Sequence, residues 1–355
     1  MAKKDTPILD AHMHQWDLRK TPRGAVSAFV KLFGWSDSLK RRAAKLLFPQ
    51  SQLRFVGKID HVTNDYLIDD YRADLSSLAS RFLGTVHVEA SWKAKKHGDF
   101  AGETAWLDQL DPDASTIKGF VGSAELDRPD LEKVLQAHEA ASTRFRGIRD
   151  KLACHPDRGV WDWARSPTLL QDRAWRAGYR MLGARGHSFD AWVYHQQLPD
   201  FIDLARVIPG TPVVLCHLGT PIGLGGSYGG LGKTASERDT IAGEWKDSLS
   251  RLADVPHVRF KIGGLLMPIL GFGAEKKTTT MSKDEFVDRV GPLLTWALDT
   301  FGMERCMFAS NFPMDKVSIS YQTLVAGLDD LLANRTEEEK QLFFSGVARD
   351  FYRIE

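Results

Sequence analysis

Short apolar runs alternate with longer amphipathic segments along the chain, a rhythm that is typical of repeated βα units. Eight such runs predict strands, at residues 8–14, 82–90, 117–124, 145–152, 191–195, 212–218, 258–264 and 305–310. The intervening segments predict helices at 101–110, 130–142, 167–178, 198–208, 237–253, 283–301 and 318–332, and a last helix at 337–350. Because eight strands separated by helices fit a closed parallel barrel better than an open doubly wound sheet, we predict an α/β fold of the (β/α)8 TIM-barrel type. At 355 residues, one barrel spans 1–355 as a single domain.

Three segments interrupt this rhythm and predict extended loops at the C-terminal mouth of the barrel. A basic insertion at 18–58 holds ten Lys or Arg residues against one acid, Asp37, and its run at 40–48 resembles a short basic amphipathic helix. A solvated lid or an oligomer contact is a commoner role for such a helix than a membrane surface. Residues 223–232 are glycine-rich, but Ser227 stands where a P-loop needs its first glycine, so we predict a flexible loop there. Residues 269–282 predict another loop over the mouth.

Composition narrows the class of protein. The 47 basic and 46 acidic residues give a net charge of +1, so no global field favours nucleic acid as a partner. The three cysteines, Cys154, Cys216 and Cys306, are far apart, which argues against a disulfide framework and favours a reducing compartment. No apolar stretch has the length of a membrane span, and the N-terminal residues lack a signal-peptide core, so we expect a cytoplasmic enzyme.

The first predicted strand carries the strongest chemical signal. Side chains alternate along a strand, so Asp10, His12 and His14 share one face, while Leu9 and its neighbours at i+2 form the apolar face. If the apolar face packs on the helices, the polar face lines the barrel interior and rises to the mouth. Two imidazoles at i and i+2 can converge on one ion or one substrate oxygen. The alternative is a pair of hydrogen-bonded histidines that close the barrel floor.

Side chains alternate in the same way along the second predicted strand. Val86, Val88 and Ala90 form its apolar face, which predicts that His87 and Glu89 point inward. His87 is equally well explained as a hydrogen-bonded core histidine.

Later strands add basic groups to the predicted interior. His217 is the last residue on its face of strand six, and strand seven places Arg259 and Lys261 on the inward face. Strand four ends with Arg149 and Asp150, although Arg149 could instead brace a loop. An interior rich in His, Lys and Arg suits a substrate with a carboxylate or a developing oxyanion.

Six motifs, in this order along the chain, resemble those of a known family. They are DAHMHQWD at 10–17, HVEASW at 87–92, FRGIRD at 145–150, LCHLGTP at 215–221, KIGGL at 261–265 and MFASNFPMDK at 307–316. Together they resemble the amidohydrolase superfamily, in particular its amidohydrolase-2 branch, which contains sugar lactonases and the 2-pyrone-4,6-dicarboxylate lactonase. The resemblance covers nearly the whole chain and implies a barrel enzyme that hydrolyses a lactone, an ester or an amide. Some relatives hold a divalent metal at the barrel mouth, and others work without one.

The resemblance also suggests roles for residues of this chain. His12, His14 and His217 match the histidines that hold the metal in such relatives, and zinc is the first expectation for an ion, with a metal-free mechanism as the alternative. His195 lies near the position of another superfamily histidine. Arg149 matches a substrate-anchoring arginine approximately.

The last motif departs from the family pattern. Many relatives have an aspartate that deprotonates the attacking water or binds metal where this chain has Asn311. An amide cannot take a proton at neutral pH and is a weaker metal ligand. Asp315, four residues on, either substitutes for that aspartate or serves the loop surface.

The first functional hypothesis is a hydrolase of a small anionic lactone or a related ester or amide, in which Glu89 or Asp315 assists as base. Arg149 and Lys261 would anchor the carboxylate or the oxyanion, with His87 and His195 as further substrate-binding candidates, and Asn311 could donate to the oxyanion. The alternatives are a metal-dependent, non-oxidative decarboxylase of an aromatic acid and a binding homologue that has lost catalysis. The expected partner is a small molecule, and a homo-oligomer is compatible with the basic insertion.

Overall fold

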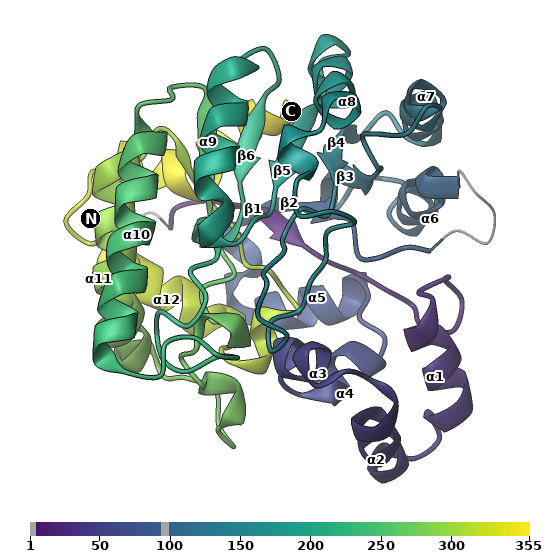
Figure 1. Cartoon of the computed structure of the whole chain (residues 1–355), viewed down its shortest axis with the longest axis horizontal. Helices are drawn as coiled ribbons and strands as arrows, with labels where there is room; N and C mark the ends of the chain where they lie inside the picture. The colour runs from purple at the N-terminus through teal and green to yellow at the C-terminus, as the bar shows by residue number, and fades with distance from the viewer. Residues whose placement is uncertain (1–4, 94–98) are drawn as a thin grey trace.

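A computed structural model of the protein describes residues 5–93 and 99–355 and contains a barrel of parallel strands (Figure 1). Eight strands pair in sequence order, namely β1 (Ile8–Met13), β2 (Phe82–Val88), β3 (Ile117–Ser123), β4 (Phe145–Arg149), β5 (Ser188–Ala191), β6 (Val213–Leu215), β7 (Val258–Ile262) and β8 (Cys306–Phe308). The ring closes beyond β8, where the amide of His14 donates to the carbonyl of Phe312 at 2.8 Å. The predicted (β/α)8 fold is therefore confirmed.

Helices between the strands surround the barrel (Figure 1). They are α6 (Gly102–Leu110), α7 (Leu131–Ala141), α8 (Arg173–Ala184), α9 (Leu198–Val207), α10 (Ala235–Ala253), α11 (Lys283–Phe301), α12 (Tyr321–Leu331), α13 (Glu337–Gln341) and α14 (Val347–Tyr352). Apart from α8, these helices agree with the predicted ranges to within a few residues at their ends.

Two predicted ranges are wrong. Strand five was expected at 191–195, but β5 ends at Ala191, and its polar residue Asp190 is satisfied inside the barrel by Lys261 and Tyr352. Hydropathy favours the apolar run that follows, because it cannot anticipate those partners. The third helix was expected at 167–178, whereas α8 begins only after Asp172, whose side chain accepts from the amide of Trp175 at 2.8 Å and caps the helix.

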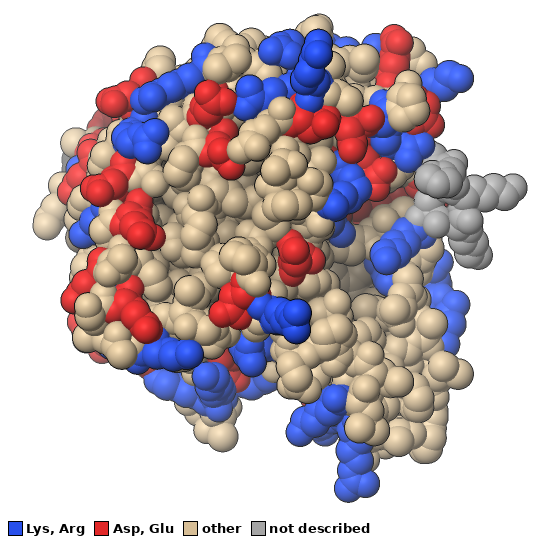
Figure 2. All heavy atoms as spheres, viewed as in Figure 1, with Lys and Arg blue, Asp and Glu red and all other residues tan. Residues whose placement is uncertain are grey.

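The basic insertion forms a cluster of short helices between β1 and β2. They are α1 (Ala25–Phe33), α2 (Asp37–Leu47) and α3 (Gln50–Val56), and α4 (Ile59–Thr63) and α5 (Ile68–Leu75) follow. The predicted amphipathic helix is confirmed as α2. Helices α1 and α2 project from the barrel in Figure 1, and Figure 2 shows basic side chains among uncharged surface at this end of the molecule.

Large exposed side chains lie on the projecting part, and Leu32, Trp35, Leu46 and Leu47 are each more than half exposed. None of the described helices is both long and apolar enough to cross a bilayer.

Below its mouth, the interior of the barrel holds an apolar cluster beside the buried Lys261–Asp190 pair. Leu9 and Ala11 of β1, with Val86 and Val88 of β2, share one buried cluster with Val214 on the opposite side of the barrel. Residues of α14 join this cluster, so the C-terminal segment closes that end of the barrel. The predicted facing of Leu9, Ala11, Val86 and Val88 towards the helices is therefore wrong.

A register shift in β1 explains how the histidines nevertheless reach the mouth. Between Asp10 and Met13, three steps along β1 correspond to two steps along β2. Such a bulge reverses the alternation of side chains. Asp10 bonds to the hydroxyl of Tyr71 on α5 at 2.8 Å, outside the barrel, whereas His12 and His14 turn to the mouth. The prediction of one inward Asp-His-His face is correct for the two histidines and wrong for Asp10.

The two predicted mouth loops brace each other. The amides of Gly223 and Gly225 donate to the carbonyls of Ile269 and Leu270, at 3.0 and 2.7 Å. Gly226 and Gly271 meet so closely that a Cβ on Gly271 would lie 2.0 Å from the carbonyl oxygen of Gly226. This close backbone contact accounts for the glycines, so a bound phosphate is not needed to explain them.

Candidate active site

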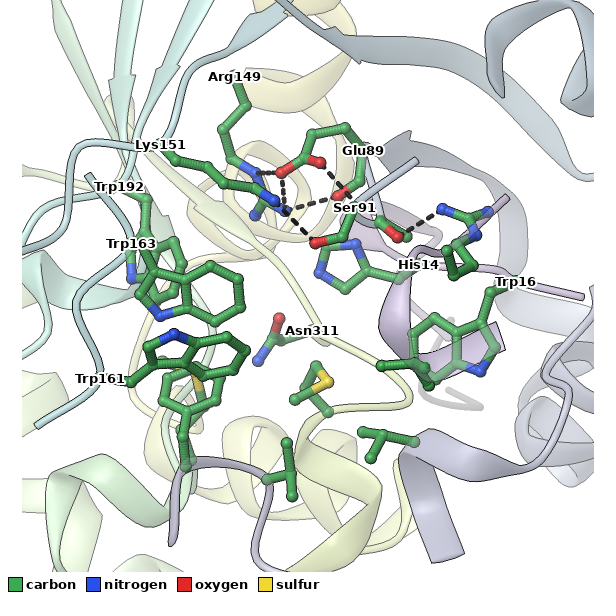
Figure 3. A pocket seen from close by; sticks show the side chains of 18 of the residues that line it. His14, Trp16, Glu89, Ser91, Arg149, Lys151, Trp161, Trp163, Trp192 and Asn311 are labelled. Atoms are coloured by element: carbon green, nitrogen blue, oxygen red, sulfur yellow. Dashed lines mark hydrogen bonds and ion pairs between the residues drawn. The ribbon is translucent and has the colours of Figure 1, made fainter. Parts of the chain in front are cut away.

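A cavity of about 190 Å³ lies at the C-terminal mouth of the barrel (Figure 3). His14, Glu89, Arg149, His217 and Asn311, which come from the ends of different strands, line its polar side. The sequence predicted all five as site residues. The C-terminal face is where barrel enzymes hold their active sites.

A series of close polar contacts runs through His12 and His14. The ammonium of Lys261 lies 3.5 Å from Nδ1 of His12, and Nε2 of His12 lies 3.1 Å from Nε2 of His14. Nδ1 of His14 lies 2.8 Å from the carbonyl of Val88. Because a carbonyl only accepts, the contact with Val88 assigns the proton of His14 to Nδ1 and leaves the lone pair of its Nε2 facing His12.

His217 enters the site from an unusual turn. Its φ is +55° and that of Leu218 is +57°, in a short helical turn, His217–Gly219, directly after β6. The turn takes the side chain out of strand alternation and places its ring 4.5 Å from that of His12. Nδ1 faces Gly264, where a Cβ would come within 2.5 Å, so Nε2 remains for the cavity.

The site favours the neutral form of all three imidazoles. Burial lowers the pKa of His12, His14 and His217 well below the usual value, the charge of Arg149 lowers all three further, and that of Lys261 lowers the pKa of His12 and His217. Neutral imidazoles can accept a proton or a metal ion.

Arg149 and Glu89 form a buried pair. Nε of Arg149 donates to Oε1 of Glu89 at 2.9 Å, and Nη2 donates to the Glu89 carbonyl at 2.6 Å. Nη1 lies 3.4 Å from Nε2 of His12. Burial would raise the pKa of Glu89, but the charges of Arg149 and Lys151 lower it to about 2. Glu89 is therefore an ionised anchor for Arg149 and a weak base.

Asn311 turns its amide nitrogen away from this pair. Nδ2 donates to Oδ1 of Asp315 at 3.0 Å, and the backbone amide of Leu266 donates to Oδ2 at 3.2 Å. The amide oxygen of Asn311 thus faces the cavity, on the side of Arg149 and Glu89 (Figure 3). Burial raises the pKa of Asp315 to about 7. Asp315 does not line the cavity, and its contacts hold Asn311 in place.

Three other predicted substrate contacts also lie off the cavity. Lys261 is fully buried and donates to Asp190 at 2.6 Å. Nε2 of His87 accepts from the amide of Gln15 at 2.9 Å, and Nδ1 of His195 accepts from the amide of Ile222 at 3.1 Å. His195 thus braces the loop that follows His217.

Sequence reasoning missed the aromatic side of the cavity and one cation. Trp16, Trp161, Trp163 and Trp192 line it, as does Lys151 (Figure 3). Lys151 follows Arg149 at i+2, the spacing that places two residues on one side of an extended chain, so alternation could have found it. The tryptophans come from loops, where no periodic signal exists.

Two sets of side chains bear on the question of a metal ion. His12, His14 and His217 are a ligand set that catalytic zinc accepts. Separately, His12, Asp190 and Cys216 place ligand atoms within 4.8 Å of one another, which is compatible with a metal site. The ammonium of Lys261, however, contacts both Asp190 and His12 of this second group.

The surroundings of His12 do not fit a resident divalent ion. Two cationic side chains lie within 3.5 Å of the ring, because the guanidinium of Arg149 faces Nε2 and the ammonium of Lys261 faces Nδ1. Among the described residues that line the cavity, Glu89 is the sole carboxylate, and it is committed to Arg149. A dication here would meet repulsion without a compensating negative charge.

Comparison with known proteins gives a family match over almost the whole chain. A family model described as Amidohydrolase matches residues 9–354. An uncharacterised protein of Sinorhizobium fredii is 28% identical over 351 residues, which cover 99% of both chains. L-fucono-1,5-lactonase of Burkholderia multivorans is 27% identical over 253 residues, 71% of this chain and 77% of the relative.

Solved structures share the fold. An amidohydrolase of Burkholderia multivorans with bound zinc superposes with a TM-score of 0.70 at 22% identity, over 98% of this chain and 100% of that one. The 5-carboxyvanillate decarboxylase of Sphingomonas paucimobilis gives a TM-score of 0.53 at 12% identity, over 99% of this chain and 100% of that one.

Proposed function

Because this chain belongs to the amidohydrolase family, as its motifs predicted, we propose that it is a hydrolase that opens a small lactone carrying a carboxylate. The observation that carries the proposal is the meeting of a neutral imidazole, His217, with the Arg149–Glu89 pair and the oxygen of Asn311 in one cavity. The similarity to L-fucono-1,5-lactonases supports the lactone as the reacting group.

The proposed reaction begins with a water molecule between Asn311 and His217. The amide oxygen of Asn311 accepts one hydrogen and orients the water, and Nε2 of His217 takes the other proton as the oxygen attacks the lactone carbonyl. His217 is preferred as base because its Nε2 remains for the cavity, whereas Glu89 is committed to Arg149 and Asp315 does not line the cavity.

Charge that develops on the carbonyl oxygen is stabilised by Arg149. Its Nη1 is the guanidinium nitrogen not used by Glu89, and fixed donors aimed at a developing oxyanion lower the barrier most. When the ring C–O bond breaks, the proton on His217 passes to the leaving alkoxide, so the product is a hydroxy acid. His12 and His14 hold the inner wall through their bonds to Lys261 and Val88.

We propose that this reaction needs no resident divalent ion, because the ammonium of Lys261 lies between His12 and Asp190 and the guanidinium of Arg149 lies beside Nε2 of His12. Lys261 therefore has a structural role, in place of the substrate anchoring expected from the sequence.

The test is a screen of carboxylated lactones by release of acid, with the wild-type enzyme and His217→Asn. We expect turnover that falls about 10²–10⁴-fold in the variant, the usual contribution of a general base. Trp35→Ala is the matched control, because Trp35 is 78% exposed and lies outside the cavity lining. Absence of hydrolysis by the wild-type enzyme, or release of carbon dioxide from an aromatic acid, would contradict the proposal.

A further inference from the structure

The cavity has an aromatic wall, formed by Phe55, Trp161, Trp163 and Trp192. The ring centroids of Trp161 and Trp163 lie 3.6 Å apart, and Trp163 lies 5.3 Å from Trp192. Phe55 packs within 5.9 Å of all three tryptophans. Figure 3 shows the rings of Trp161 and Trp163 beside each other at the edge of the cavity. Flat apolar groups stack on such faces.

The basic insertion contributes to this wall and to the surface next to it. Phe55 and Val56 belong to α3, Val26 to α1, and Met267 and Met314 add flexible apolar side chains. The insertion therefore shapes the part of the cavity that receives the non-reacting portion of a substrate.

Polar groups of the lining are largely occupied by one another. Arg23 bonds to Glu103 and to the carbonyl of Ala90, Glu89 pairs with Arg149, and the hydroxyl of Ser91 accepts from Lys151 at 2.9 Å. On the aromatic side the indole N–H of Trp163 is a buried donor without a hydrogen-bond partner, so a ligand with several hydroxyl groups would leave water and gain few partners there, which disfavours its binding.

One cation in the cavity has no carboxylate partner. Among the described residues, Lys151 makes no ion pair, and its ammonium lies 5.3 Å from the ring centroid of Trp163. Its remaining donors can receive one anion next to the aromatic wall.

The cavity is large enough for the aromatic ring of a substrate. A dry apolar cavity of roughly 150 Å³ holds a benzene molecule. The cavity of about 190 Å³ is somewhat larger.

On this basis, and resting on the proposed hydrolysis of a lactone, we propose that the substrate is an aryl-substituted or benzo-fused lactone with one carboxylate. Its flat apolar part stacks on the aromatic wall, and its carboxylate binds Lys151. A polyhydroxylated sugar lactone is the poorer substrate, in contrast to the named activity of the L-fucono-1,5-lactonase relatives.

The experiment compares three six-membered lactones, namely a benzo-fused lactone with one carboxylate, the corresponding monocyclic lactone carboxylate and an aldonolactone. We expect kcat/KM for the benzo-fused substrate to exceed that for the aldonolactone by about 100-fold, because each hydroxyl that leaves water without a partner costs free energy. Equal or faster hydrolysis of the aldonolactone would overturn the inference while leaving the proposed function intact.

Two variants and one control distinguish the loss of a specific substrate contact from a general loss of activity. Trp163→Ala should lower the ratio of kcat/KM for the benzo-fused over the monocyclic lactone by about 10- to 100-fold, the range for removal of a large apolar contact. Lys151→Met should lower kcat/KM for the carboxylate more than for its methyl ester. Trp35→Ala is the matched control and should change neither ratio. An unchanged ratio in Trp163→Ala would argue against stacking.

Binding keeps the inference testable if no lactone is hydrolysed, an outcome that refutes the proposed function. The ring-opened aryl hydroxy acid should then quench tryptophan fluorescence of the wild-type protein and bind at least about 10-fold more weakly to Trp163→Ala. Failure of this acid to bind, or equal binding of the aldonate, would overturn the substrate class.

Discussion

The ammonium of Lys261 lies 3.5 Å from Nδ1 of His12, inside the barrel and below the cavity. The same ammonium donates to Asp190 at 2.6 Å, and both side chains are fully buried. Tyr352 completes the group with its hydroxyl 2.9 Å from Asp190. The positive charge that faces His12 is thus fixed by the fold, and it disfavours a further cation at this imidazole.

Substitution of Lys261 should therefore lower the free energy of unfolding of the protein. Lys261→Met leaves the Asp190 carboxylate buried and unpaired, and breaking such a pair costs about 3–5 kcal/mol of unfolding free energy. The double variant Lys261→Met/Asp190→Asn should recover most of this loss. Urea denaturation of the three proteins measures it, and a double variant no more stable than the single one would contradict a direct pairing.

The raised pKa of Asp315 predicts a pH dependence of stability. The unfolded value is near 3.8 and the folded value about 7, so between these values the native state holds a proton that the unfolded state releases. The free energy of unfolding should fall as pH rises through this window, by on the order of 2–4 kcal/mol, and then level off.

Asp315→Asn is the variant that isolates this contribution. The melting temperature of this variant minus that of the wild-type protein should increase from pH 4 to pH 8, because an amide does not titrate. All other carboxylates titrate in both proteins, so their contributions cancel in this difference. A constant difference across this range would show that Asp315 keeps an ordinary pKa.

Metal analysis should find the purified enzyme active without stoichiometric zinc. Two cations near His12 oppose a dication, so treatment with a chelator should change kcat by less than about twofold. Elemental analysis and assays before and after dialysis check this. Loss of activity that added zinc restores would contradict it and return His12, His14 and His217 to the role of metal ligands.

Arg149 should act mainly on kcat. Arg149→Lys keeps a positive charge but cannot bond to both the side chain and the carbonyl of Glu89, so kcat should fall by about 10²–10³-fold, as for loss of an oxyanion donor. KM for a lactone that lacks a carboxylate should change little. An effect confined to KM would indicate that Arg149 anchors the substrate instead.

The sequence alone predicted the barrel, because eight apolar runs at regular spacing leave few other ways to bury them. It also predicted that His12, His14, Glu89, Arg149, His217 and Asn311 gather at one site, since the ends of parallel strands share one face. The structure confirms the barrel and brings these six residues together.

Only the tertiary structure decided what each group does there. The bulge in β1 let His12 and His14 reach the mouth although Leu9 and Ala11 face the interior, and the partners of Lys261 and Asp315 drew both side chains off the cavity. The wall of Trp161, Trp163 and Trp192 comes from loops with no periodicity. Alternation along a strand is local and can be read from sequence, whereas register, buried pairing and loop packing depend on contacts between distant segments.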